Sequence, residues 1–163
     1  MKVVNHRLEG ANWKSSPNYG GIITPELIVI HYTGSNSLQG GLNWLCDPKA
    51  KVSAHLLIAK TGQIWQLVPF NHRAWHAGRS EYDGRPDVNS FSIGIENVGF
   101  GDEWPESQIK ANIDVINALC QEYDIVALAG HNDVAVPAGR KADPGPLYPW
   151  ERVLKECGFE YEN

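Results

Sequence analysis

The chain has 163 residues, a length that suits one domain with a hydrophobic core. Its hydrophobic fraction of 42% and charged fraction of 20% are ordinary for a soluble globular protein. The net charge of −5 excludes a general electrostatic attraction to nucleic acid or to anionic membranes.

The N-terminal 24 residues are rich in Asn, Gly, Ser and Pro, so we expect an irregular arm at the start of a single domain over residues 1–163. They contain no apolar segment of signal-peptide length, and no run in the chain approaches the ~20 apolar residues that cross a bilayer. We therefore expect a soluble protein, cytoplasmic as synthesised and without a membrane span. Action at a cell wall would require release or delivery by another route. The three cysteines are widely spaced, which favours free thiols.

The first predicted strand covers residues 27–30, a compact apolar run that leads directly into His31. Residues 37–46 follow as a short predicted helix, which Asp47 and Pro48 should end. A strand over residues 53–59 and a second over 63–68, separated by a Thr-Gly turn, then predict a hairpin.

The middle of the chain reads as a loop over residues 70–90 and then a strand over 91–98. Side chains alternate along a strand, so Ile93 and Ile95 should share one face and Glu96 should lie on the other.

The clearest predicted helix covers residues 105–123, where apolar side chains recur every three or four positions. A short strand over 125–129 should end next to His131. Residues 132–149 contain four prolines and two glycines and predict a loop, and residues 150–157 predict a last helix. Alternating strands and helices favour an α/β fold, with a mixed central sheet flanked by helices.

Polar residues at strand ends are the chemical candidates. A catalytic zinc ion needs three protein ligands and an open position. His31 and His131 each follow a predicted strand, and Asp143 lies in the proline-rich loop. Spacing alone does not select among the six histidines, and there is no H-E-x-x-H motif. Taken singly, each of these residues also fits an ordinary structural role.

Five sequence blocks, taken together, resemble the type 2 N-acetylmuramoyl-L-alanine amidases, a family related to phage amidases and peptidoglycan recognition proteins. The blocks follow the family's order and cover most of the chain from Leu27 to Trp150; they are residues 28–33, 53–58, 74–78, 92–96 and 131–146. The resemblance implies the amidase fold of the recognition proteins. It also implies zinc-dependent hydrolysis of the amide between N-acetylmuramic acid and L-alanine, in peptidoglycan or its muropeptide fragments.

Site roles are implied residue by residue. His31, His131 and Asp143 match the family's zinc ligands, and the non-catalytic relatives have lost the third. Glu96 matches the carboxylate that moves the proton, and Lys141 matches the lysine that stabilises the oxyanion.

Further residues near these blocks are candidates for substrate binding. We assign Tyr32, Trp75, His76 and Asn89 to this group. His76 is equally compatible with a role in holding its own loop. His55 is expected to be structural.

Two alternatives to this enzyme remain open at this stage. One is a module of the same fold that binds peptidoglycan without cutting it, and the other is an unrelated metallohydrolase. Within the enzyme interpretation, the sequence leaves three settings open: recycling of soluble anhydro-muropeptides, a phage lysin, and an amidase delivered to another cell's wall.

Overall fold

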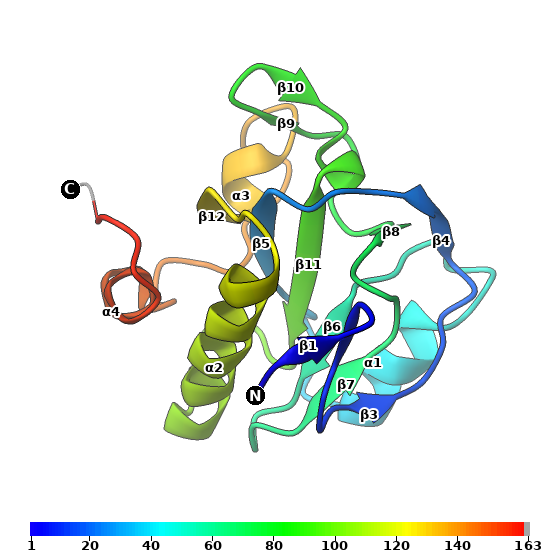
Figure 1. The fold of residues 1–163 in the computed structure, drawn as a ribbon, viewed down its shortest axis with the longest axis horizontal. Helices are drawn as coiled ribbons and strands as arrows, with labels where there is room; N and C mark the ends of the chain where they lie inside the picture. Colours follow the sequence, from blue (N-terminus) through cyan, green and yellow to red (C-terminus); the bar gives the residue numbers. More distant parts are fainter. Residues whose placement is uncertain (162–163) are drawn as a thin grey trace.

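A computed structural model describes residues 1–161 (Figure 1). Within these residues the main sheet has six strands in the order β12-β5-β11-β6-β7-β3. In chain order, its strands are β3 (Asn12–Trp13), β5 (Leu27–Tyr32), β6 (Leu56–Ile58), β7 (Ile64–Gln66), β11 (Ser92–Asn97) and β12 (Ala127–Gly130). Strands β6 and β7 are antiparallel and the other neighbours are parallel. The predicted mixed sheet with flanking helices is confirmed.

Two helices cover opposite faces of this sheet. Helix α2 (Glu106–Glu122) packs its apolar stripe on one face, where it contacts the isoleucines of β5 and β11. Helix α1 (Leu38–Leu45) packs on the other face against Leu57. Figure 1 shows α2 crossing the β12–β5 side of the sheet and α1 lying near β7. On the side of the sheet that faces away from α2, Leu27 and Val29 of β5 pack in a third apolar cluster, and His31 and Glu96 follow near the carboxyl ends of β5 and β11.

The helix ends follow local sequence signals. Ser37 caps α1 by accepting a hydrogen bond from the backbone N–H of Gly40, and α1 ends before Asp47 as predicted. Pro105 is the residue that precedes α2 rather than a member of its first turn. Helix α4 (Trp150–Glu156) matches its prediction and packs against α2 through Val153.

The N-terminal 24 residues are not an irregular arm, so this prediction was wrong. They form β1 (Val3–Val4), β2 (Arg7–Leu8) and β4 (Tyr19–Ile22), together with β3 of the main sheet. The partner of β4 is β8 (His72–Ala74), about fifty residues away along the chain. The order of this segment therefore comes from distant strands, which its own composition does not reveal.

Two predicted loops contain short regular elements. Residues 70–90 include β8, β9 (Glu81–Tyr82), β10 (Arg85–Pro86) and the 3-10 turn η1 (Val88–Ser90). The loop expected after His131 begins instead with the one-turn helix α3 (His131–Val134). The three cysteines are free thiols in the described chain.

Candidate metal centre and active site

The candidate site is built on the face of β5 and β11 that faces away from α2. These strands are parallel and in register, so Glu96 lies directly beside His31. Their neighbours Ile30 and Ile95 point to the α2 face and are fully buried in the core. Strand alternation thus directs both polar side chains to the same side of the sheet.

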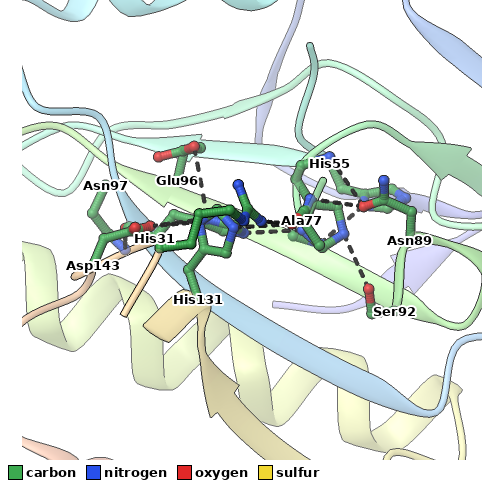
Figure 2. Close-up of polar contacts among 12 residues, drawn as sticks. His31, His55, Ala77, Asn89, Ser92, Glu96, Asn97, His131 and Asp143 are labelled. Atoms are coloured by element: carbon green, nitrogen blue, oxygen red, sulfur yellow. Dashed lines mark hydrogen bonds and ion pairs between the residues drawn. The ribbon is translucent and has the colours of Figure 1, made fainter. Parts of the chain in front are cut away.

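Three buried side chains converge at the carboxyl end of β5. The Nδ1 atom of His31 lies 3.1 Å from Nδ1 of His131 and 3.0 Å from Oδ2 of Asp143. The remaining pair, Nδ1 of His131 and Oδ2 of Asp143, is 3.2 Å apart. These residues form a group that could hold a metal ion, and all three are buried. Figure 2 shows Asp143 and His131 on adjacent sides of His31.

The donor set and spacing of this group fit zinc. Two imidazole nitrogens and one carboxylate oxygen are ligands that zinc commonly takes at catalytic sites. Two such atoms around a tetrahedral zinc ion lie roughly 3.3 to 3.6 Å apart, so the pairs here would open by roughly 0.1 to 0.6 Å. The site therefore fits the ion with little movement of the chain.

Short backbone contacts place Asp143 beside the histidines. The carbonyl oxygen of Asp143 accepts a hydrogen bond from the N–H of Asn132, 2.9 Å away, in the turn that also carries His131. Gly130 leaves room for this approach, because a Cβ atom there would lie 2.8 Å from Cδ of Pro144. The backbone hydrogen bond and the close approach at Gly130 thus hold His131 and Asp143 next to each other.

Each histidine of the group uses its second ring nitrogen in a further contact. Nε2 of His31 lies 2.9 Å from Nδ1 of His76, and Nε2 of His131 lies 3.1 Å from the carbonyl oxygen of Ala77. The side-chain oxygen of Asn89 accepts hydrogen bonds from the N–H groups of both His76 and Ala77. Such outer contacts fix the tautomer and orientation of a metal-ligating histidine.

Glu96 is the unpaired carboxylate of the site. Its Oε1 lies 4.0 Å from Nδ1 of His31, and its buried Oε2 has no hydrogen-bond partner among residues 1–161. Burial and, to a smaller extent, the charge of Asp143 raise the pKa of Glu96 well above its ordinary value, while Lys141 acts to lower it. A carboxylate in this state is a better proton acceptor than an exposed one.

The metal group responds differently to burial. Burial alone would raise the pKa of Asp143, but the hydrogen bonds from His131 and His31 hold it below its usual value. Burial lowers the pKa of His31, partly offset by its hydrogen bond to Asp143. The arrangement therefore favours an ionised carboxylate beside a neutral imidazole, which are the protonation states that ligate a metal.

A cleft of about 460 Å³ opens onto this cluster. Its lining includes Glu96, Lys141 and Asp143 together with the aromatic residues Tyr32 and Trp75. A space of this size accommodates a small ligand next to the ligand atoms and the unpaired carboxylate.

Comparison with known proteins assigns the family. The family model described as N-acetylmuramoyl-L-alanine amidase matches residues 23–146, which is most of the chain. The chain belongs to this amidase family.

Curated relatives agree with this assignment. The amidase is 38% identical over 168 aligned positions to the 1,6-anhydro-N-acetylmuramyl-L-alanine amidase AmpD of Escherichia coli, covering 89% of this chain and 91% of the relative. It is also 34% identical to the N-acetylmuramoyl-L-alanine amidase AmiD of the same organism, over 80% of this chain and 52% of that protein.

Solved structures confirm the predicted amidase fold. A crystal structure of selenomethionine AmpD superposes with a TM-score of 0.87 at 35% identity, covering 96% of this chain and 99% of that chain. A complex of E. coli AmiD with the substrate anhydro-N-acetylmuramic acid-L-Ala-D-γ-Glu-L-Lys gives a TM-score of 0.76 at 30% identity. That match covers 95% of this chain and 62% of AmiD.

The amidase brings most of the predicted site residues together. His31, His131 and Asp143 form the cluster, and Glu96 and Lys141 lie at the same cleft. Asn89 does not line the cleft, contrary to its grouping with the substrate-binding candidates. The side chain of Asn89 is buried, and its oxygen accepts hydrogen bonds from the backbone N–H groups of His76 and Ala77. The sequence does not reveal these contacts.

Other side chains near the site were missed or only partly understood. Trp44, which lines the cleft from α1, and Ser92, which contacts the ring of His76, were not predicted. The alternation of β11 could have indicated Ser92, because it lies four residues before Glu96 on the same face. His55 binds the backbone N–H of Gly94 and the carbonyl oxygen of His72, in agreement with a structural role.

Within residues 1–161 of the amidase, no helix has the length and apolar character that crossing a membrane requires.

Proposed function

We propose that this amidase is a zinc enzyme that hydrolyses the amide between 1,6-anhydro-N-acetylmuramic acid and L-alanine in soluble muropeptides. One observation carries the proposal: three ligand atoms converge beside a carboxylate with an unpaired, buried oxygen, and His131, Asp143 and Glu96 line a cleft. The similarity to AmpD extends over about nine tenths of both chains and supports the choice of substrate.

The ligands of the metal are His31, His131 and Asp143 in this proposal. Zinc held there would polarise the scissile carbonyl and lower the pKa of water. An amide needs this assistance because its carbonyl is a weak electrophile and its nitrogen is a poor leaving group.

Glu96 is the proton carrier of the proposed reaction. Its carboxylate accepts the proton of the attacking water and passes it to the nitrogen of the departing alanine. The raised pKa of Glu96 makes it a stronger base for the first transfer. The side chain has no competing partner within residues 1–161 at Oε2, so that atom is available for the proton.

Lys141 supplies the positive charge for the oxyanion that develops when water adds to the carbonyl. It lines the same cleft as Glu96 and Asp143. Loss of one such stabilising group typically slows hydrolysis by about 100- to 1,000-fold. Tyr32 and Trp75 also line the cleft, and we place the sugar and the first peptide residues against them.

The alternative of a non-catalytic binding module is weaker. Such a module needs neither a complete set of metal ligands nor a proton carrier, and the cleft contains both Asp143 and Glu96.

The test is digestion of a soluble anhydro-muropeptide and of intact peptidoglycan side by side, with mass analysis of the products. We expect rapid release of a peptide with a free L-alanine amino group from the soluble substrate. A chelator should abolish the release and zinc should restore it. Full activity in metal-free protein would contradict the zinc mechanism. Faster cleavage of intact peptidoglycan would contradict the proposed substrate, and binding without cleavage by zinc-loaded protein would support the binding module.

A further inference from the structure

The imidazole of His76 lies behind the candidate metal group rather than in the open cleft. Only 8% of this residue is exposed, although it borders the cleft. Nδ1 lies 2.9 Å from Nε2 of His31, and Nε2 lies 3.0 Å from Oγ of Ser92. Both ring nitrogens are therefore occupied by protein atoms, which leaves neither for a substrate.

These contacts are consistent with a single set of tautomers. When Nδ1 of His31 ligates a metal, its proton is on Nε2, which then donates to Nδ1 of His76. His76 must in turn carry its proton on Nε2, where it donates to the hydroxyl oxygen of Ser92. The contacts thus define the direction of both hydrogen bonds: His31 donates to His76, and His76 donates to Ser92.

The ring of His76 packs against one face of strand β11. Ser92, Gly94 and Glu96 alternate along one face of the strand, opposite Ile93 and Ile95. Ser92 binds the outer nitrogen of His76, and Glu96 lies beside His31. At position 94 a Cβ atom would lie only 2.4 Å from Cγ of His76, so only glycine leaves room for the ring.

The main chain around His76 is held as firmly as the ring. Asn89 accepts hydrogen bonds from the backbone N–H groups of His76 and Ala77 at 3.1 and 2.8 Å. Ser53 accepts one from the N–H of the preceding Trp75, at 2.9 Å. Because the carbonyl oxygen of Ala77 contacts Nε2 of His131, this one segment supports both histidine ligands.

We propose that His76 is a positioning residue for the metal site: it fixes the tautomer and ring orientation of His31, and Gly94 provides the space in which it does so. The inference rests on the proposed zinc ligands, but it concerns a residue outside that ligand set, whose two ring nitrogens contact protein atoms. It also replaces the prediction that His76 binds substrate. Loss of such an outer partner typically weakens metal binding by about 10- to 100-fold.

The test compares two replacements of similar size. In His76→Asn, the side-chain oxygen can occupy the position of Nδ1 and still accept the hydrogen bond of His31. His76→Leu has the same branching but offers no acceptor. Zinc affinity is measured on the folded full chain by competition with a chelator, without substrate. We expect zinc affinity to fall about 10- to 100-fold in the Leu variant and much less in the Asn variant.

A matched control is His72→Leu. The ring of His72 also makes a hydrogen bond within the protein, from Nδ1 to the carbonyl oxygen of Gly20 at 3.1 Å, but it does not contact His31. Its replacement should leave zinc affinity unchanged. If His76 only fills space, the apolar Leu variant should bind zinc at least as well as the Asn variant, and this order would overturn the inference.

A measurement on the unmodified protein covers the case in which the variants do not fold. Long-range ¹H–¹⁵N spectra of the zinc-loaded protein should show His76 protonated at Nε2 and unprotonated at Nδ1. Protonation of His76 at Nδ1 would overturn the inference while leaving the zinc site intact. Failure of the wild-type protein to bind zinc would overturn the proposed function and this inference together, so the two failures are distinguishable.

Discussion

The two faces of strands β5 and β11 differ in what their side chains contact. On the α2 face, Ile28, Ile30, Ile93 and Ile95 are fully buried among other apolar side chains. On the opposite face, Leu27 and Val29 pack in a smaller apolar cluster, but His31 and Ser92 make directed contacts between named polar atoms.

Within the same two strands, the apolar side chains contribute mainly to the free energy of folding, and the polar side chains form the candidate site. Burial of apolar area is non-directional, so the α2 face contributes free energy of folding through its volume and packing. The polar residues of the opposite face depend on the orientation of individual nitrogens and oxygens, each of which needs its own partner. Changes on the two faces should therefore have different consequences.

The largest expected effect on the polar face comes from Glu96→Gln. This change keeps the shape of the side chain but removes the proton acceptor, so turnover should fall about 100- to 10,000-fold. Zinc content should stay at one ion per chain. Steady-state kinetics and metal analysis measure the two quantities. Glu106→Gln, which removes an exposed carboxylate paired with Arg152, is the control and should not change turnover. Near-normal turnover in the Glu96 variant would remove Glu96 from its role.

The same variant has a second consequence in metal-free protein. Because the folded-state pKa of Glu96 is raised, its contribution to stability is present below its ordinary value of 4.5 and is lost as pH rises through the folded pKa. Glu96→Gln lacks this loss. Unfolding measured across this pH range should therefore show the variant gaining stability relative to wild type as pH rises. The opposite trend would contradict the raised pKa.

On the apolar face, Ile28→Ala should destabilise the protein by about 2 to 5 kcal/mol, because it leaves a cavity in the packed core. Ile28 is fully buried and packs in the α2-side core. Denaturant unfolding measures the free energy, and chelator competition measures zinc affinity of the folded variant. Zinc affinity should be within a few-fold of wild type. A loss comparable to that of His76→Leu would show that the two faces are not separable.

A smaller effect should link Gly94 to His76. Gly94→Ala places a methyl group against the imidazole, so it should be strongly destabilising in the wild-type background. In His76→Ala the nearest atoms of that clash are absent, and the same change should cost less. A double-mutant cycle of unfolding free energies should give a coupling of about 0.5 to 3 kcal/mol. Additive effects would show that Gly94 serves some other purpose.

The sequence predicted the elements whose signals are local. The apolar run before His31, the helical periodicity of residues 105–123 and the hairpin around the Thr-Gly turn all matched the structure. Strand alternation also placed Glu96 opposite Ile95 correctly. These patterns arise because burial of one side of a helix or strand places apolar residues at a regular spacing within a short stretch of sequence.

The missed features depend on contacts between distant parts of the chain. Strands β3 and β4 are short and have no periodicity, and their order comes from pairing with β7 and β8. The role of Asn89 lies in two backbone N–H groups of another segment. The contact between His76 and Ser92 joins a loop residue to β11, so neither segment alone reveals it.

The most direct test of the metal centre is a crystal structure of zinc-loaded protein with anomalous diffraction measured at the zinc absorption edge. We predict one anomalous peak, within about 2.0 to 2.2 Å of Nδ1 of His31, Nδ1 of His131 and a carboxylate oxygen of Asp143. The ring of His76 should remain hydrogen bonded to Nε2 of His31. A zinc peak away from these three atoms, or ligation of His31 through Nε2, would contradict the account.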